Sequence, residues 1–318
     1  MEQRNLGHSG LRVSVVGLGC NNLGGRIDTA ASGRVVHKAI DLGITLFDTA
    51  DSYGKQYGFP GGSERALGEV LGERRKDIVL ATKFSNPMDD AGRLKGASRR
   101  YVMSAVEASL ARLRTDWIDL YQIHYPDPLT PIEETLRALD DLVRQGKVRY
   151  IGCSNFAPWQ LVEGQWAARH LGLDTFASCQ DEYSLLVRGL EREAIPVMRR
   201  YGVGLLPYFP LASGLLTGKY RPGAAMPEGA RLTDTKRLAD RYMTDANVAR
   251  TERLRGFAEA KGHTLLELAF AWLLAQPVVS SVIAGATKPE QVEANIRAAA
   301  WTLTSGDLAE VDWLLGDT

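Results

Sequence analysis

Short runs of apolar, strand-forming residues alternate with amphipathic stretches almost from one end of the chain to the other. Gly, Asp, Ser or Pro borders most of the runs, and the stretches between them repeat their apolar positions every three to four residues, as helices do. Eight runs predict strands, at residues 13–19, 45–49, 78–84, 118–124, 148–154, 175–180, 203–208 and 281–286. Repeated strand-helix units indicate a parallel sheet covered by helices, and eight units predict a closed barrel.

Two segments depart from this alternation. Residues 1–14 carry His-Ser-Gly at 8–10 between short alternating runs, which predicts a β-hairpin that plugs the bottom of the barrel. Residues 213–247 are longer than an ordinary loop between strand and helix, and such loops tend to be lids or clamps. We therefore expect an α/β protein, a (β/α)8 TIM barrel with an N-terminal β-hairpin and a long loop after its seventh strand, in one domain over residues 1–318.

Composition narrows the class of partner. The 318 residues are 45% hydrophobic and 24% charged, and 38 basic side chains balance 38 acidic ones, so the formal net charge is zero. A neutral chain offers no general attraction to nucleic acid or anionic lipid, which favours a small molecule as the partner. The sequence has no apolar run of membrane-spanning length and no signal peptide, so we expect a cytoplasmic protein. It does not indicate the oligomeric state.

The cysteines predict neither disulfides nor a metal site. Cys20, Cys153 and Cys179 are odd in number and lie far apart in the chain. The sequence has neither a CxxC motif nor the spacing of zinc ligands, so we expect reduced thiols and no metal site. The chemistry must then come from other side chains.

Four ionisable side chains are predicted to meet at one rim of the barrel. Asp48 lies at the end of the predicted strand at 45–49 and Tyr53 follows that strand, while Lys83 and His124 lie at the ends of the next two strands. The carboxyl ends of barrel strands carry the active site, and consecutive strands are neighbours in space. Taken alone, each residue has an ordinary structural explanation, as a turn cap, a solvated amine or a packed imidazole. Four of them on three neighbouring strands favour an active site.

These side chains favour carbonyl reduction. A phenol loses its proton at about pH 10 in water, and the ammonium of Lys83 should lower that pKa, so that Tyr53 can donate a proton to a carbonyl oxygen. Asp48 would hold the ammonium in place, and His124 would hydrogen-bond the same oxygen. The sequence places no nucleophile, metal ligands or phosphate-binding loop beside them, so hydrolysis and phosphoryl transfer fit poorly. Reduction then requires a source of hydride.

Longer motifs give nearly the whole chain a resemblance to one family. In order they are GLRVSVVGLGCNNLGG, FDTADSYG, GGSERALGEVL, TKF, LYQIHYPDP, GKVRYIGCSNF, QDEYSLLVRGLE, PLASGLLTGKY and IAGATKPEQVEANI. Their order and spacing resemble those of the aldo-keto reductases. The resemblance implies an oxidoreductase that uses NADPH, converted to NADP+, to reduce an aldehyde or ketone to an alcohol. It also implies that Tyr53 is the general acid in reduction and the general base in oxidation, within a catalytic tetrad of Asp48, Tyr53, Lys83 and His124.

The resemblance also implies where the cofactor binds. The matching positions are Asp48, Ser154, Asn155, Gln180, Tyr208, Pro210, Leu211, Lys219, Arg231, Gly285, Thr287, Lys288, Gln291 and Asn295. The first five would surround the nicotinamide, the next four would hold the pyrophosphate beneath the long loop, and the last five would hold the adenosine end. A cation at Lys288, near a helix N-terminus, would favour NADPH over NADH. Phe209 replaces a serine that is frequent in related chains, which removes a hydroxyl that could contact phosphate.

Two other interpretations compete with this one. An open dinucleotide-binding sheet would use the early glycines, but Gly24 follows Gly17 and Gly19 without the GxGxxG spacing, and Asp41 lies inside a helical pattern rather than at a strand end. The other is a channel β-subunit that binds NADPH and regulates a partner, as some members of the resembled family do. All four tetrad positions are filled and we expect no long extension before the barrel, so turnover is the favoured interpretation.

Overall fold

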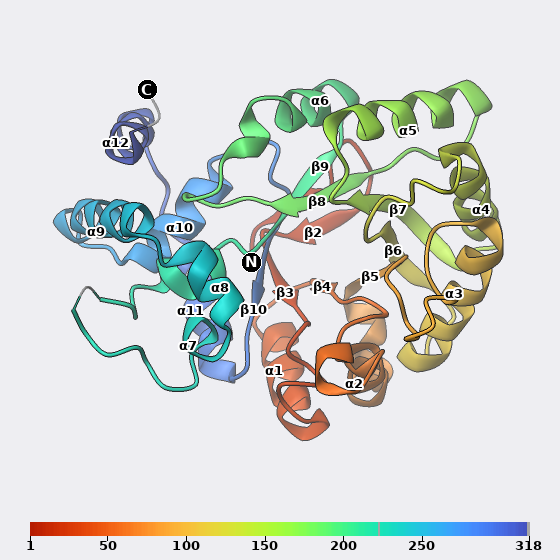
Figure 1. Ribbon diagram of the computed structural model, residues 1–318, viewed down its shortest axis with the longest axis horizontal. Helices are drawn as coiled ribbons and strands as arrows, with labels where there is room; N and C mark the ends of the chain where they lie inside the picture. The colour runs from red at the N-terminus through yellow and green to blue at the C-terminus, as the bar shows by residue number, and fades with distance from the viewer. Residues whose placement is uncertain (222, 317–318) are drawn as a thin grey trace.

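A ring of eight parallel strands forms the centre of the protein in the computed structural model, which describes residues 1–221 and 223–316 (Figure 1). The strands are β3 (Val16–Gly19), β4 (Leu46–Asp48), β5 (Val79–Phe84), β6 (Ile118–Ile123), β7 (Val148–Ser154), β8 (Ser178–Glu182), β9 (Gly204–Tyr208) and β10 (Val282–Gly285). They pair in the order β10, β3, β4, β5, β6, β7, β8, β9. Pro222 of the expected long loop and residues 317–318 of the expected domain lie outside the described residues.

The ring closes between β9 and β10 through a short seam. Leu205 of β9 forms a parallel bridge with Val279, just ahead of β10. Leu205 N donates to the carbonyl oxygen of Val278 over 2.8 Å, and Ser280 N donates to the carbonyl oxygen of Leu205 over 3.0 Å. The predicted (β/α)8 barrel is therefore confirmed.

Helices follow the strands and cover the outside of the ring (Figure 1). Those that alternate with strands are α1 (Thr29–Asp41), α2 (Gly62–Val70), α3 (Arg99–Leu113), α4 (Ile132–Arg144), α5 (Pro158–Leu171), α6 (Ala194–Tyr201), α10 (Leu265–Leu274) and α11 (Pro289–Ala298). In α4 the buried Leu136, Leu139 and Leu142 recur every three residues and form the stripe that faces the sheet. Two further helices, α9 (Asp245–Ala260) and α12 (Ser305–Leu315), pack against each other, and α9 also packs on α10. None of the helices within the described ranges has the length and apolar character needed to cross a membrane.

A β-hairpin precedes the barrel and fills one end of it. Its antiparallel strands are β1 (Gln3–Asn5) and β2 (Arg12–Ser14). Leu6 and Val13, both 0% exposed, pack with barrel-interior side chains such as Leu46, Leu120 and Leu206. The predicted hairpin is confirmed, and its apolar side chains enclose the interior of the ring.

Two strand boundaries differ from the prediction. The run at 13–19 is two strands, because Ser14 makes local bonds that interrupt it: Ser14 Oγ donates to the carbonyl oxygen of Val16 over 2.6 Å, and Ser14 N donates to Thr45 Oγ1 over 2.9 Å. The strand expected at 175–180 begins at Ser178 and continues through two acidic residues to Glu182. Acids are rare in strands, so the sequence pattern ended too early.

The long segment after β9, residues 209–244 with residue 222 left aside, is called the strap below. It contains the short helices α7 (Arg231–Asp234) and α8 (Lys236–Tyr242), which lie beside β10 (Figure 1). Arg26, in the loop after β3, reaches across to the strap: its Nη2 donates to the carbonyl oxygen of Gly229 over 2.8 Å and to Asp234 Oδ2 over 2.9 Å. The strap, which follows β9, is thereby tied across β10 to the loop after β3.

Candidate active site

A buried ion pair lies at the base of the candidate site. Lys83 is the last residue but one of β5 and its side chain is 0% exposed. Its Nζ donates to Asp48 Oδ2 over 2.7 Å and to the carbonyl oxygen of Thr49 over 2.8 Å. Burial alone would lower the pKa of Lys83, but the charge of Asp48, with a further contribution from Tyr53 as hydrogen-bond partner, outweighs burial and raises it. The lysine is therefore an ammonium at neutral pH.

The Asp48 carboxylate is held on both of its oxygens. Gln122 of β6 and Gln180 of β8 each donate through Nε2 to Oδ1, over 3.2 Å and 2.9 Å, while Lys83 occupies Oδ2. Asp48 is 2% exposed, so these three bonds replace the water that a carboxylate requires. The two glutamines therefore fix the position of the Asp48 carboxylate, and the carboxylate in turn fixes the position of the Lys83 ammonium.

Tyr53 lies within hydrogen-bond distance of this lysine. Lys83 Nζ donates to Tyr53 Oη over 3.3 Å. Burial raises the pKa of Tyr53, Lys83 opposes that effect and Asp48 adds to it, so that the pKa is raised overall. The expectation of a lowered pKa is therefore wrong for this structure, because desolvation of the phenolate exceeds the attraction of a lysine that Asp48 already neutralises. The phenol is protonated at neutral pH, as a proton donor must be.

His124 faces Tyr53 as a neutral imidazole. The two ring centroids are 5.9 Å apart and the rings are nearly perpendicular. Burial, with a smaller contribution from Lys83, lowers the pKa of His124 to about 3. Asn86 Nδ2 lies 3.0 Å from His124 Nδ1. An amide nitrogen donates and does not accept, so Nδ1 is the acceptor and the ring proton lies on Nε2.

The ends of β7, β8 and β9 present a connected set of polar side chains. Asn155 Nδ2 donates to the carbonyl oxygen of His124 over 2.9 Å, and Tyr208 Oη donates to Asn155 Oδ1 over 2.8 Å. Ser154 Oγ donates to the carbonyl oxygen of Gln180 over 2.7 Å. These residues, predicted to surround a nicotinamide, do lie together and beside His124.

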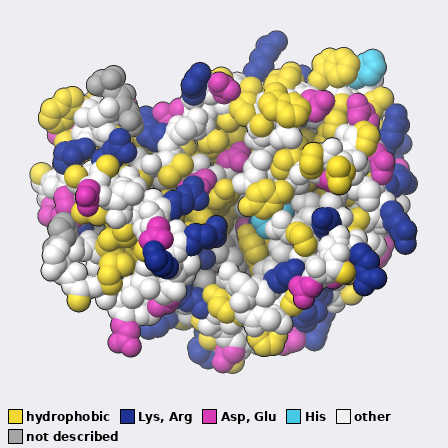
Figure 2. Space-filling view, viewed as in Figure 1, with side chains coloured by type: hydrophobic (Ala, Val, Ile, Leu, Met, Phe, Trp, Pro, Cys, Tyr) yellow, Lys and Arg dark blue, Asp and Glu magenta, His cyan; other side chains and the backbone are white. Residues whose placement is uncertain are grey.

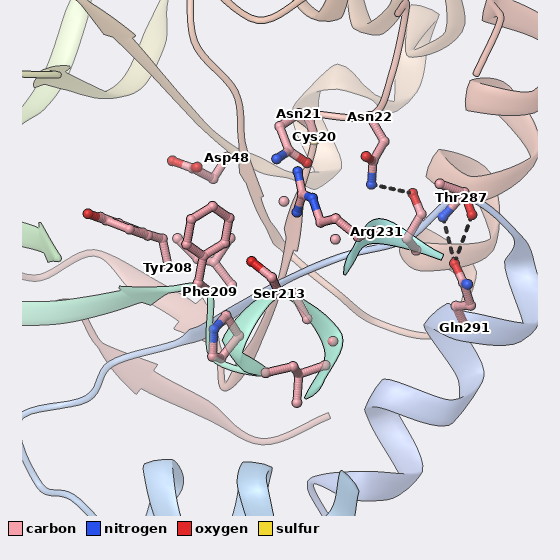
Figure 3. A pocket seen from close by; sticks show the side chains of 18 of the residues that line it. Cys20, Asn21, Asn22, Asp48, Tyr208, Phe209, Ser213, Arg231, Thr287 and Gln291 are labelled. Carbon is pink, nitrogen blue, oxygen red and sulfur yellow. Dashed lines mark hydrogen bonds between the residues drawn. The ribbon is translucent and has the colours of Figure 1, made fainter. Parts of the chain in front are cut away.

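These side chains open into a cavity of about 650 Å³. In Figure 3, Tyr208 and Phe209 lie on one side, Asn22, Thr287 and Gln291 on the other, and Arg231 reaches between them. Most of the predicted site residues line this cavity, namely Asp48, Tyr53, His124, Ser154, Asn155, Gln180, Tyr208, Pro210, Leu211, Lys219, Arg231, Gly285, Thr287, Gln291 and Asn295. Lys83 lies beneath it. Lys288 is exposed at the start of α11 and is not part of the lining.

The lining is strongly cationic although the chain is neutral. Lys and Arg side chains gather beside the central hollow (Figure 2), and the basic residues of the lining are Arg26, Lys219, Arg231, Arg237 and Arg241. Among the described residues of the lining, Asp48 is the single acid, and Lys83 already pairs with it. Burial and the charges of Arg26 and Arg231 lower the pKa of Lys219. Such a cavity favours an anionic ligand.

Phe209 has a structural role in the strap. Its ring lies 5.4 Å from the guanidinium carbon of Arg231, at cation-π distance, and packs edge-on against Tyr208 and Tyr242. The ring therefore supports Arg231 above the cavity floor. The lost hydroxyl is replaced by a surface that positions a cation.

Comparison with known proteins identifies the class. The model of the Aldo/keto reductase family matches residues 15–315. The chain belongs to the aldo-keto reductase family. An uncharacterized oxidoreductase of Bacillus subtilis, YrpG, is 39% identical over 94% of this chain and 91% of its own length. The L-glyceraldehyde 3-phosphate reductase of Escherichia coli K12 is 32% identical over 100% of this chain and 93% of its own length. A probable voltage-gated potassium channel subunit beta of Arabidopsis thaliana is 37% identical over 94% of this chain and 91% of its own length.

This aldo-keto reductase is an NAD(P)H-dependent oxidoreductase, and its cavity fits such a cofactor. Lys219 and Arg231 have no carboxylate within ion-pair distance in residues 1–221 and 223–316. Lys219 is exposed but Arg231 is partly buried, and a partly buried cation without an acid is costly unless a ligand supplies the negative charge. Gly285 provides room, since a side chain there would meet Asn22 Nδ2 at 3.2 Å.

Sequence reasoning missed several side chains that shape the site of this aldo-keto reductase. They are Asn86, Gln122, Arg26, Arg237 and Arg241. A weak signal existed for Gln122, because a glutamine beside Tyr121 and Ile123 in the strand IDLYQIH is expected to be buried and then needs a polar partner. Arg237 and Arg241, four residues apart in a charged stretch, look like an ordinary solvated helix face.

Proposed function

We propose that this aldo-keto reductase reduces an aldehyde or ketone to an alcohol with NADPH, and that Tyr53 acts as general acid in reduction and general base in oxidation. The observation that supports this most directly is the position of Lys83 Nζ, 2.7 Å from Asp48 Oδ2 and 3.3 Å from Tyr53 Oη. When bound, the nicotinamide dinucleotide supplies the hydride.

Each tetrad member has a separate task in this proposal. Tyr53 gives its Oη proton to the substrate oxygen, and the Lys83 ammonium stabilises the phenolate that remains. Asp48, held by two glutamines, keeps the ammonium in position. His124 donates from Nε2 to the same substrate oxygen and orients it, because Asn86 occupies Nδ1.

The cofactor would be held by three groups of side chains. Ser154, Asn155 and Gln180 lie where the nicotinamide amide would bind, with Tyr208 alongside. Lys219 and Arg231, next to Pro210 and Leu211 of the strap, would neutralise the pyrophosphate. The adenosine end would meet the lining residues Gly285, Thr287, Gln291 and Asn295. We further propose that the exposed Lys288, at the start of α11, pairs with the 2′-phosphate and so favours NADPH over NADH.

The decisive experiment is Tyr53→Phe, which keeps the ring and removes the proton donor. We expect kcat for carbonyl reduction to fall by at least ~10²-fold, the size of a general-acid contribution, while the Kd of NADPH stays within about twofold. Tyr57→Phe is the matched control, because Tyr57 lies nearby and is 40% exposed. Near-normal reduction by Tyr53→Phe would show that another group supplies the proton.

A regulatory role is the second candidate, because one relative is named as a probable channel subunit beta. The two functions separate in a panel of aldehydes and ketones followed by loss of NADPH absorbance. Glyceraldehyde 3-phosphate belongs in that panel, since another relative is named as its reductase. Tight NADPH binding without turnover of any carbonyl would favour the regulatory role.

A further inference from the structure

Two arginines of α8 form a cationic wall in the cavity that the cofactor proposal does not use. Arg237 and Arg241 are four residues apart, so they project from the same face of the helix, and both line the cavity. Arg241 pairs with Glu182 at the end of β8, and Glu182 also accepts a hydrogen bond from the hydroxyl of Tyr242. Arg237 has no carboxylate within ion-pair distance among the described residues.

The other three cations of the cavity are neighbours of one another. Arg26, Lys219 and Arg231 form one group, close enough that the charge of Arg26 contributes to lowering the pKa of both Lys219 and Arg231. Arg241 lies near Tyr208 instead, whose pKa is raised by burial first and then by Glu182 and Tyr125, while Arg241 lowers it.

The neighbourhood of Tyr208 also connects the wall to the reaction centre. Tyr125, which shares that neighbourhood, stacks on His124 with ring centroids 5.3 Å apart and an angle of 17°. Tyr208 itself is bonded to Asn155, whose amide holds the backbone of His124. Arg241 therefore lies by the part of the cavity mouth next to the carbonyl site.

We propose that Arg237 and Arg241 bind an anionic group, a carboxylate or a phosphate, carried by the carbonyl substrate, so that the enzyme selects charged aldehydes or ketones over neutral ones. The inference rests on the proposed carbonyl reduction and specifies its substrate class. Guanidinium groups pair with carboxylate and phosphate through two parallel hydrogen bonds, which gives orientation as well as attraction. Glu182 cancels the charge of one arginine and orders its side chain, so one positive charge remains for a substrate anion.

The test compares matched substrates in the NADPH-loaded enzyme. One pair is 4-oxobutanoate and butanal, and the other is glyceraldehyde 3-phosphate and glyceraldehyde, so the two pairs separate carboxylate from phosphate recognition. We expect the wild type to have kcat/KM at least about tenfold higher for the charged member of one pair, the effect of one or two charge-assisted bonds. In Arg237→Gln/Arg241→Gln we expect that preference to disappear through a higher KM for the charged member only.

The control variant is Lys236→Gln, which removes a charge from α8 at an exposed position that pairs with Asp240 and is not part of the lining. It should leave the preference unchanged, and thermal unfolding should show that both variants remain folded. The Kd of NADPH is measured for each, by quenching of tryptophan fluorescence. An equal loss for charged and neutral substrates, or a Kd that rises with the loss of the arginines, would assign them to folding or to the cofactor and overturn the inference.

Failure of the underlying reaction gives a different result. If neither member of either pair turns over although NADPH binds, the proposed carbonyl reduction is overturned and this inference with it. If both members turn over with equal kcat/KM in the wild type, carbonyl reduction stands and the assignment of the α8 arginines is wrong.

Discussion

At the scale of single residues, the site depends on which atoms of His124 are free. With Nδ1 accepting from Asn86, the proton at Nε2 is available to a substrate oxygen, and the low pKa of His124 keeps the ring neutral across the physiological range. In the proposed reaction, a neutral donor beside a protonated Tyr53 would provide two hydrogen bonds to one oxygen. Neither residue has to change protonation state before the carbonyl arrives.

Replacing Asn86 with Asp tests this arrangement with almost no change of shape. A carboxylate accepts from Nδ1–H, so it moves the ring proton away from Nε2 and raises the pKa of His124. We expect kcat for reduction to fall roughly tenfold or more, the cost of a lost orienting bond. Since a raised pKa makes the ring charged at low pH and neutral at high pH, the variant should also show a new dependence of rate on pH in the acid to neutral range.

The wild type should lack that dependence, because its imidazole stays neutral above about pH 3 and its phenol is protonated up to alkaline pH. Asn86→Ala is the companion variant, because it removes the donor to His124 Nδ1 without adding an acceptor that would hold a proton there. A wild-type rate and a flat pH profile in Asn86→Asp would mean that the tautomer of His124 does not matter.

At the scale of elements, the tie between the strap and the loop after β3 is a single arginine. Arg26 binds both the carbonyl oxygen of Gly229 and Asp234, and the side chains of the ion pair are 27% and 46% exposed. Partly exposed ion pairs contribute only ~0.2 to 1 kcal/mol. This tie is therefore weak enough to break when a ligand enters or leaves.

Asp234→Asn should accelerate that exchange. Removing the charge of the pair weakens the tie, so we expect the dissociation rate of NADPH to rise roughly two- to fivefold, as a loss below 1 kcal/mol implies. Stopped-flow displacement of bound NADPH measures the rate. Asp240→Asn is the control, because Asp240 lies on α8 and pairs with exposed Lys236. An unchanged rate in Asp234→Asn would mean that the tie does not limit release.

The elements also show which parts of the structure can be predicted from the sequence. Buried parallel strands are continuous apolar runs, so all eight could be found, and the tetrad could be placed because strand ends meet at one rim. The break between strands at Ser14 could not be predicted, since Val13 and Val16 on either side are both buried and no change in the apolar pattern marks it. Asn86 and Arg241 could not either, because their partners, His124 and Glu182, are distant in sequence and only the closed barrel brings them together.

At the scale of the whole molecule, the two ends of the barrel are built differently. The hairpin end is closed by apolar side chains, including Leu6 and Val13, and carries no part of the site. The opposite end gathers five cations around a cavity in a protein with no net charge. Attraction of an anionic ligand is thus concentrated at one opening, where salt screens it over about 8 to 10 Å.

The seam between β9 and β10 links ligand binding to the integrity of the ring. Tyr208 ends β9 and the strap follows it, while Gly285 ends β10 and α11 follows it. A dinucleotide held by both groups would therefore cross the seam, where a single β-bridge joins the two sides, and would stabilise it. Binding to the closed form alone would then suppress local opening. We expect NADPH to slow deuterium uptake at the amides of Leu205 and Ser280 more than at β6 and β7, whose ladder pairs five residues. Uniform slowing, or none, would mean that the ring is already closed without the ligand.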